Sequence, residues 1–224
     1  MKTFHELQEG VYDPHIFKAF FLAGGPGSGK SEVVRSTTGG LGLKIVNSDN
    51  AFENLLKKAG LSLKMPPEEK EPRDVQRDRA KELTISRRDN YLEGRLGIVI
   101  DGTGHKADKL IRHSIELQQL GYDTHMIFVN TSLDVALQRN EMRPRSVPTP
   151  IVTKSWKNVL ANIGQFSQHF SGRFVVIDNN DSKEKMQKDI FPKIWKIIRN
   201  LAKMKVTNTR AKNWIRMELK KKAR

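Results

Sequence analysis

The sequence predicts an α/β fold in which a parallel five-stranded sheet is sandwiched between helices. Short apolar runs alternate with helical segments along the chain, the pattern of strands joined by helical crossovers. Such crossovers are right-handed and leave the strands parallel, with helices on both faces of the sheet. The 224 residues are enough for one core of ordinary size, and no internal repeat is visible.

In the N-terminal half, three apolar runs predict strands and three segments predict helices. One helix follows a glycine-rich stretch, and a second opens at the capping residues Asn47, Ser48 and Asp49. The third is long, highly charged and free of glycine and proline, which favours a solvent-facing helix. In chain order we expect a strand at 15–23, a helix from Lys30, a strand at 44–46, a helix over 47–58, a loop over 65–72, a helix over 73–93 and a strand at 96–100.

The C-terminal half continues the alternation, with Gly121 ending one helical pattern and an Arg- and Pro-rich loop following another. In chain order we expect a helix over 107–120, a strand at 124–129, a helix over 133–140, a loop over 143–150, a helix opened by Pro150, a strand at 174–177 and a closing helix over 183–204. The closing helix should bury one apolar stripe, made of Ile190, Phe191, Ile194, Ile197, Ile198 and Leu201.

Composition excludes several classes of protein. Hydrophobic residues make up 37% of the chain, and no apolar run approaches the roughly 18 residues of a spanning helix, so we expect no membrane protein. The absence of cysteine excludes a disulfide scaffold and a thiolate metal site. The N-terminus lacks the apolar core of a secretory signal, so a reducing, cytoplasmic setting is expected.

Positive charge is concentrated at the C-terminus. The chain has 40 Lys and Arg against 25 Asp and Glu, a net charge of +15, and residues 203–224 hold nine of these cations and one Glu. We therefore expect three parts, an N-terminal arm at 1–14, a domain over 15–202 and a basic tail at 203–224. The tail is either a DNA or RNA contact driven by counterion release or a solvated basic end. Trp214 and Ile215 favour some ordered packing.

The strongest motif is a phosphate-binding loop. Residues 24–31 fit G-x-x-x-x-G-K-[ST], and they lie between an expected strand and an expected helix, which is the context this motif requires. Its amides and the helix N-terminus would bind the phosphates of ATP. Lys30 would neutralise the β and γ phosphates, and the Ser31 hydroxyl would bind the bridging Mg²⁺. The expected nucleotide-binding residues are Gly25, Gly27, Ser28, Gly29, Lys30, Ser31 and, from a later segment, Arg143.

Other features narrow the class of P-loop protein. The chain has no N-K-x-D sequence for reading guanine and no L-S-G-G-Q transporter signature, and it is too short for a motor. A kinase with a small-molecule or polymer substrate remains.

Two carboxylates follow expected strands, where ligands of parallel sheets bind. Asp49 is placed to act as the base toward an acceptor hydroxyl, or else as a helix N-cap. Asp101 ends an apolar strand as a Walker-B carboxylate does, so it would hold Mg²⁺ or the incoming hydroxyl. Which of the two is the base stays open. Thr103 and His105, in the glycine-containing turn after Asp101, are candidate substrate contacts.

Three arginines, Arg139, Arg143 and Arg145, crowd the segment where a lid over the phosphates is expected. Arginine suits the phosphoryl oxygens of a transition state, and a closed lid keeps water from the transferred phosphate.

These residues resemble two families of P-loop kinases, the zeta toxins and the phage polynucleotide 5′-kinases. Residues 99–104 and 117–124 are similar to the strand, D-G-T-G turn, helix and G-Y-E-T of zeta toxins. Residues 138–140, with Arg143 and the Val-Pro at 147–148, are similar to the lid of polynucleotide kinases. The resemblance extends over about three quarters of the chain.

Both resemblances imply Lys30 on the ATP phosphates, Asp49 as the general base, and lid arginines near Arg139 and Arg145. They imply different acceptors, the sugar of UDP-N-acetylglucosamine for zeta toxins and a nucleic-acid 5′-hydroxyl for polynucleotide kinases. The basic tail favours a nucleic acid or nucleotide, and a hydroxylated base in modified phage DNA is a third acceptor. A nucleic-acid-binding ATPase without an acceptor is the alternative from another class.

Residues 1–9 resemble the capsid-targeting peptide of internal proteins in T-even-type phages, with cleavage after Glu9. This resemblance implies a phage protein packaged in the head. A short arm packed on the core is the alternative.

Overall fold

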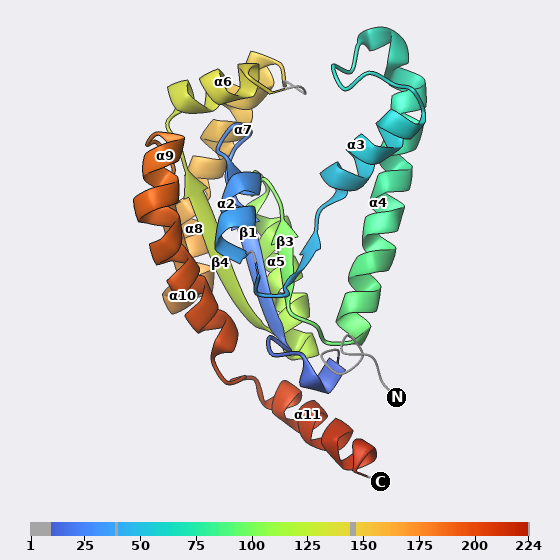
Figure 1. Cartoon of the computed structure of the whole chain (residues 1–224), viewed down its shortest axis with the longest axis vertical. Coiled ribbons are helices and arrows are strands. Elements are labelled where there is room, and N and C mark those ends of the chain that lie inside the picture. The colour runs from blue at the N-terminus through green and yellow to red at the C-terminus, as the bar shows by residue number, and fades with distance from the viewer. Residues whose placement is uncertain (1–9, 39, 144–146, 224) are drawn as a thin grey trace.

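The centre of the molecule is a parallel sheet of five strands in the order β2-β3-β1-β4-β5, which confirms the expected fold class (Figure 1). A computed structural model describes residues 10–38, 40–143 and 147–223, so the residues 1–9 and Arg145 of the predictions above lie outside the described part. The strands are β1 (Lys18–Ala23), β2 (Lys44–Val46), β3 (Ile98–Asp101), β4 (Asp123–Asn130) and β5 (Phe174–Asp178).

Helices cover both faces of this sheet. One face packs on α5, α7, α8 and α11, and the other on α2 and α10. The helices are α2 (Lys30–Thr38), α3 (Ser48–Lys58), α4 (Lys70–Glu93), α5 (Ala107–Leu120), α6 (Leu133–Glu141), α7 (Thr149–Ala161), α8 (Ile163–Phe170), α9 (Lys183–Lys185), α10 (Phe191–Lys203) and α11 (Thr209–Lys222), with short turns η1 (Gly10–Tyr12), η2 (Pro67–Glu69), η3 (Ser171–Arg173) and η4 (Met186–Ile190). None of the described helices is long and apolar enough to cross a membrane.

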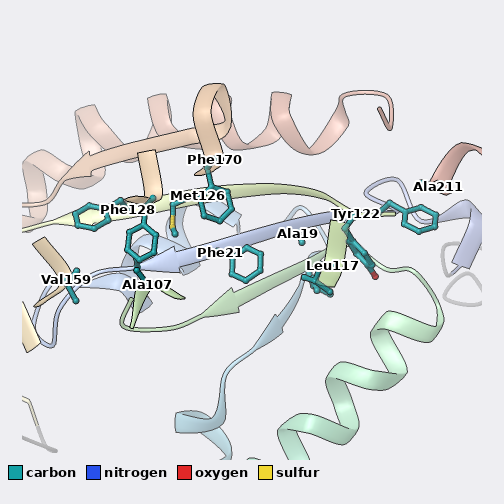
Figure 2. Close-up of a cluster of buried hydrophobic side chains, with 14 residues drawn as sticks. Ala19, Phe21, Ala107, Leu117, Tyr122, Met126, Phe128, Val159, Phe170 and Ala211 are labelled. Carbon is teal, nitrogen blue, oxygen red and sulfur yellow. The ribbon is translucent and has the colours of Figure 1, made fainter. Parts of the chain in front are cut away.

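β1 is the central strand, and every one of its residues is buried. Its side chains point alternately into two apolar clusters. Phe21 packs with Met126 and Phe170 on one face (Figure 2). Phe20 and Leu22 pack on the other face. A strand buried on both faces must be apolar throughout, which is why the run was visible in the sequence. The parallel register brings the residues after each strand to one edge of the sheet.

Two helices form a hairpin that projects from the sheet, and the C-terminal end of α4 packs on the sheet cluster through Tyr91 and Leu92 (Figure 1). α3 and α4 pack on each other through a small cluster of their own around Phe52, Leu56 and Ala80. α4 starts three residues before the expected Arg73, because Pro72 lies in its first turn, where no backbone N–H is needed. The expected loop over 65–72 is therefore partly helical.

The closing helix differs from the expectation. Instead of one helix over 183–204, the chain forms α9, the π-helical turn η4 and α10, with Pro192 in the first turn of α10. The expected burial of Ile197 is wrong, since this side chain is 42% exposed. Ile197 lies about 100° around the helix from Ile198, which is buried. The buried stripe consists of Phe191, Ile194, Ile198 and Ala202.

The basic segment ends in a packed helix. Ala211 of α11 is fully buried, and Trp214 meets the ring of Phe17 edge-on with 5.4 Å between ring centres. Trp214 and Ile215 both join the apolar cluster of the sheet, which confirms their expected ordered packing. Figure 1 places α11 at the end of the sheet opposite α6 and the tip of the α3–α4 hairpin.

Candidate active site

The phosphate-binding loop connects β1 to α2, as the motif requires. Its conformation needs glycine, since Gly27 and Gly29 have φ of +78° and +82°. A Cβ on Gly27 would lie 2.0 Å from the carbonyl oxygen of Ala136 on α6, and one on Gly29 would lie 2.4 Å from the Asn179 amide. The loop is thus a close-fitted cradle with room for backbone only.

Lys30 folds back over this loop. Its Nζ donates to the carbonyl oxygens of Gly24 at 2.6 Å and Gly25 at 3.1 Å. Burial lowers the pKa of the Lys30 ammonium, while the negative charges of Asp101 and Asp49 oppose this effect. Lys30, the residue expected to bind the ATP phosphates, therefore lies near both Asp49 and Asp101.

Residues outside the motif hold the loop from behind. The carbonyl oxygen of Ser28 accepts from Asn179 Nδ2 at 2.7 Å and from Thr131 Oγ1 at 3.2 Å. Trp156 packs on Gly25 and donates from its indole to Thr131 O at 2.7 Å. None of these three supports was predicted from the sequence, although Thr131 and Asn179 lie just past two strands, where polar residues indicate a site. The Ser28 hydroxyl is buried without a partner among the described residues.

Asn47 links the two carboxylates. Its Nδ2 donates to Asp101 Oδ2 at 2.6 Å, and its Oδ1 accepts from the backbone N–H of Asp49 at 2.6 Å. Asn47 is therefore the N-cap of α3, and the alternative of Asp49 as the N-cap is wrong because α3 already begins at Ser48. Burial raises the pKa of the Asp101 carboxyl, whereas nearby Lys30 favours its ionised form.

Asp49 forms an ion pair that sequence analysis did not anticipate. Arg77 Nη1 lies 2.8 Å from Asp49 Oδ1, and its guanidinium stacks on the Phe52 ring at 4.8 Å. Arg77 belongs to α4, whose charged residues occur on every side of the helix, so no pattern singled it out.

The expected lid arginines occupy different places. Arg139 lies on α6, where its guanidinium donates to the carbonyl oxygens of Asn179 at 2.7 Å and Asp181 at 3.2 Å, so it stands beside the phosphate-binding loop. Arg143 lies just beyond α6, and its charge acts on both Lys30 and Asp101. Arg145 lies outside the described residues.

The turn after Asp101 abuts the phosphate-binding loop. The carbonyl oxygen of Thr103 accepts from the backbone N–H of Gly24 at 3.0 Å, and the Thr103 hydroxyl hydrogen-bonds the exposed ring of His105. Ser31, in the first turn of α2, lines a cavity of about 910 Å³ together with Asp101. In the part of the chain that is described, no group of three or more His, Cys, Asp or Glu side chains could hold a metal ion.

Residues 13–189 match the sequence model of the zeta toxin family. The chain belongs to the zeta toxin family. This membership, together with the phosphate-binding loop between strand and helix, makes it a P-loop kinase, that is, a phosphotransferase that binds nucleotide, and the fold implies ATP. The predicted resemblance to zeta toxins is confirmed.

Solved structures agree with the fold of this zeta toxin family member. A protein from Chloroflexus aurantiacus described as a kinase has a TM-score of 0.51 at 14% identity, covering 83% of this chain and 96% of its own. Shikimate kinase from Acinetobacter baumannii in complex with shikimate has a TM-score of 0.50 at 16% identity, covering 85% and 98%. No curated protein matches the sequence.

Proposed function

We propose that the chain transfers the γ-phosphate of ATP to a hydroxyl of a nucleic acid or nucleotide. The observation that carries this proposal is the convergence of Lys30, Asp49 and Asp101 at the phosphate-binding loop, beside a cavity with a cationic wall. That cavity, of about 790 Å³, lies between the α3–α4 hairpin and the α6–α7 segment, and Lys64, Arg73 and Arg77 line it. Cations beside a kinase base suit an acceptor that carries phosphate.

Each side chain then has a role in the transfer. The backbone amides of residues 25–31 and Lys30 bind the ATP phosphates, Asp49 accepts the proton of the attacking hydroxyl, and Arg139, Arg143 and Arg145 bind phosphoryl oxygens. Thr103 and His105 contact the acceptor from the neighbouring turn. The glycine cradle and the buried Ser28 hydroxyl, which has no hydrogen-bond partner among the residues that the structure describes, fit a phosphate ligand.

Mg²⁺ fits the oxygen donors of Ser31 and Asp101, which line one cavity. When bound, the ion would neutralise charge on the β and γ phosphates. Asp101 is the alternative base, and its raised pKa comes from burial.

One contact supports a lid role for the segment that resembles polynucleotide kinases. Asn140 donates from Nδ2 to Val147 O at 2.7 Å and accepts from Val147 N–H at 3.0 Å, so its side chain closes the base of the loop that carries Arg143. A closed base helps such a loop to act as a lid.

The basic residues 203–224 are proposed as a separate DNA or RNA contact, since α11 lies at the end of the sheet away from the reacting groups (Figure 1). Deleting the segment would expose the core that Ala211 covers. Substituting Lys212, Arg216 and Lys220 with Gln is therefore the cleaner test. The loss of three phosphate contacts should reduce the slope of log K for duplex binding against log salt concentration by about 2.7. An unchanged slope would show that these residues do not bind the nucleic acid.

UDP-N-acetylglucosamine is the second candidate acceptor, because the family match extends over residues 13–189. In this case the same residues would direct the γ-phosphate to a sugar hydroxyl.

The decisive experiment measures transfer from γ-labelled ATP with Mg²⁺ to 5′-hydroxyl DNA and RNA, hydroxymethyl-base DNA, nucleosides and UDP-N-acetylglucosamine. Label on a nucleic acid or nucleotide supports the leading proposal, and label on the sugar nucleotide alone supports the second. Acceptor-independent release of phosphate as the sole activity would indicate the ATPase alternative. Asp49→Asn should abolish transfer while ATP binding persists, whereas an active variant would move the base to Asp101.

A further inference from the structure

Arg77 is held by two contacts that both come from α3. Its Nη1 pairs with Asp49 Oδ1 at 2.8 Å, and its guanidinium carbon lies 4.8 Å from the centre of the Phe52 ring. The aromatic face fixes the plane of the guanidinium without using its N–H groups. Within the described residues, Asp49 is the only group that accepts a hydrogen bond from Arg77. Arg77 therefore retains several donors for a ligand.

The cavity beside this ion pair has the size and charge of a phosphate site. Its volume of about 790 Å³ lies within the usual range of small-ligand pockets. Arg73, one helical turn before Arg77 on α4, is anchored by a hydrogen bond of 3.0 Å from Nη1 to Met65 O. Lys64 adds a third cation. Asp74 and Glu141 also line the cavity, but both side chains are exposed, and Asp74 keeps 59% of its surface in solvent.

We propose that this cavity binds a phosphate group of the acceptor and that Arg77 leaves Asp49 to bind it. The proposal rests on the kinase function proposed above, and it restricts the acceptor to molecules that carry a phosphate near the hydroxyl they present. The exchange is favourable because the Asp49 side chain is 45% exposed, so the existing ion pair is weak. A phosphate offers more charge than a carboxylate, and it accepts two hydrogen bonds from one guanidinium.

The exchange links acceptor binding to base function. While Arg77 holds Asp49, that carboxylate is a poor proton acceptor. When Arg77 binds the acceptor phosphate, its ion pair with Asp49 breaks. Asp49 then accepts the hydroxyl proton as the hydroxyl oxygen bonds to the γ-phosphorus. The bond from that phosphorus to the β,γ-bridging oxygen breaks, and ADP leaves with the electron pair. When water is the acceptor, no phosphate binds Arg77 and its ion pair with Asp49 persists. Hydrolysis of ATP therefore stays slow.

The test compares Arg77→Gln and Arg77→Lys with Arg79→Gln, a control that changes an exposed arginine two residues further along α4. Two acceptor pairs share a hydroxyl and differ in phosphate, thymidine 3′-monophosphate with thymidine and N-acetylglucosamine 1-phosphate with N-acetylglucosamine. We expect Arg77→Gln to raise the KM of the phosphate-bearing member roughly ten- to hundred-fold. The KM of its phosphate-free partner should stay unchanged, and the kcat for this partner should rise several-fold, as for hydrolysis. Arg77→Lys keeps the positive charge, so its KM for the phosphate-bearing acceptor should lie between those of the wild type and Arg77→Gln. Arg79→Gln should have the KM of the wild type.

ATP hydrolysis without acceptor gives a second, independent readout. Arg77→Gln should raise it several-fold, and adding Asp49→Asn should return it to the wild-type level. Equal loss of transfer to both members of a pair would make Arg77 merely structural and overturn the proposal, as would unchanged hydrolysis in Arg77→Gln. A wild-type protein that phosphorylates no acceptor would instead refute the proposed function, and the hydrolysis comparison would still decide whether Arg77 restrains Asp49.

Discussion

Asn47 holds Asp101 by a hydrogen bond of 2.6 Å, and the same side chain caps the helix that carries Asp49. One amide thus fixes the end of β3, which carries Asp101, relative to the start of α3, which carries Asp49. A methyl group cannot replace its two functional groups, because the amide oxygen accepts from the N-terminus of the helix and the amide N–H donates to Asp101.

Asn47→Ala should therefore lower activity more than stability. Loss of the cap costs about 1 kcal/mol, while the released Asp101 and the shifted start of α3 should reduce kcat by about ten-fold or more. Asn208→Ala is the matched control, since Asn208 caps α11 through the N–H of Arg210, far from the reacting groups. Steady-state kinetics and urea unfolding of both variants measure the difference. Equal losses of kcat in the two variants would contradict a special role for Asn47.

Local sequence was sufficient to predict the parts of the site that depend on neighbouring residues. The phosphate-binding loop and the positions of Asp49 and Asp101 follow from short motifs and from the ends of apolar runs. Arg77 could not be found in this way, because it meets Asp49 across 28 residues of sequence and lies on a helix with no apolar stripe to orient it. Asn179 is separated from Ser28 by 151 residues, so its contact depends on the sheet order.

The fold shows the same division. Buried strands appear in the sequence as apolar runs, so all five strands could be predicted. β1 and β3 begin a few residues later than expected. The break between α9 and α10 was not predicted, although Pro192, which lies in the first turn of α10, is a residue that interrupts a continuous helix.

Gly27→Ala should disrupt the phosphate-binding loop through contact as well as strain. A left-handed φ of +78° costs a non-glycine residue about 1 to 2 kcal/mol, and the new methyl would lie 2.0 Å from Ala136 O, which forces α6 away. Gly42 has a similar φ of +75° but no atom within 4 Å of its would-be Cβ. Gly42→Ala should therefore lose only the strain energy and keep ATP affinity, as calorimetry would report. Matching losses of ATP affinity in both variants would exclude the contact with α6 as the cause.

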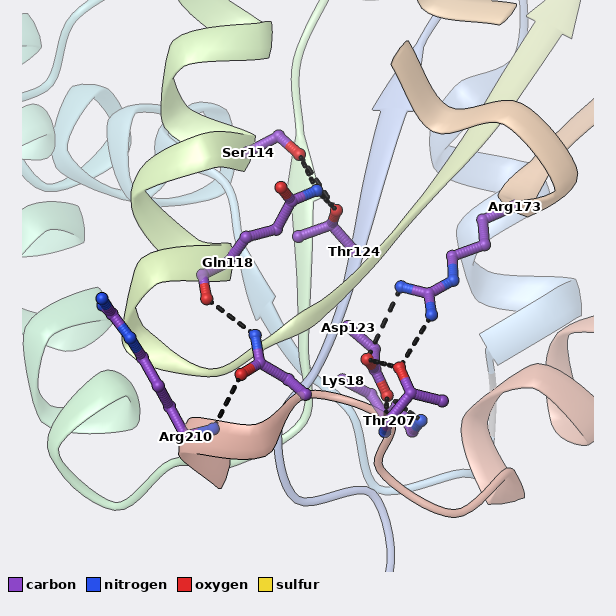
Figure 3. A network of polar contacts seen from close by, with 9 residues as sticks. Lys18, Ser114, Gln118, Asp123, Thr124, Arg173, Thr207 and Arg210 are labelled. Carbon is purple, nitrogen blue, oxygen red and sulfur yellow. Dashed lines mark hydrogen bonds and ion pairs between the residues drawn. The ribbon is translucent and has the colours of Figure 1, made fainter. Parts of the chain in front are cut away.

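Asp123 connects the start of β4 to the segment before α11 through a buried network (Figure 3). Its carboxylate pairs with Lys18 at 2.8 Å and accepts from Thr207 N–H at 3.0 Å. Although burial opposes ionisation, the hydrogen bonds from Lys18 and Thr207 keep the pKa of Asp123 below its usual value.

Removing the Asp123 carboxylate alone should be severe. Asp123→Ala leaves a buried ammonium without a counter-charge, which costs about 3 to 5 kcal/mol of unfolding free energy. Asp78→Ala, which breaks an exposed pair with Lys81, should cost at most about 1 kcal/mol. The double variant Lys18→Met with Asp123→Leu should recover much of the loss, because no buried cation is left unpaired and Arg173, which also pairs with Asp123 at 3.5 Å, is 38% exposed. Urea unfolding measures all three, and a double variant no more stable than Asp123→Ala would show that Thr207, not Lys18, dominates the network.

His125 should make the protein sensitive to acid. The ring is 3% exposed, stacks on Phe20 at 4.9 Å, and has no partner for either nitrogen in the part of the chain that is described. Burial, with help from the charges of Arg173 and Lys18, lowers the pKa of His125 to about 3. In the unfolded chain the pKa of His125 is about 6.5. At pH values between about 3 and 6.5, the unfolded state therefore binds a proton at His125 that the folded state does not bind. The free energy of unfolding should therefore fall as pH drops from 6.5 towards 3, by up to about 1.4 kcal/mol per pH unit.

His125→Phe keeps an aromatic ring against Phe20 and removes the titrating group. Its unfolding free energy, measured in urea at several pH values, should exceed that of the wild type by a margin that grows as the pH falls below 6.5 and stays constant above it. His125→Gln serves the same comparison if the Phe ring packs poorly, since it too cannot take up a proton. Because each variant is compared with the wild type at every pH, other acidic and basic groups cancel in the difference. Parallel curves for the wild type and both variants would show that the folded state accommodates a charged His125.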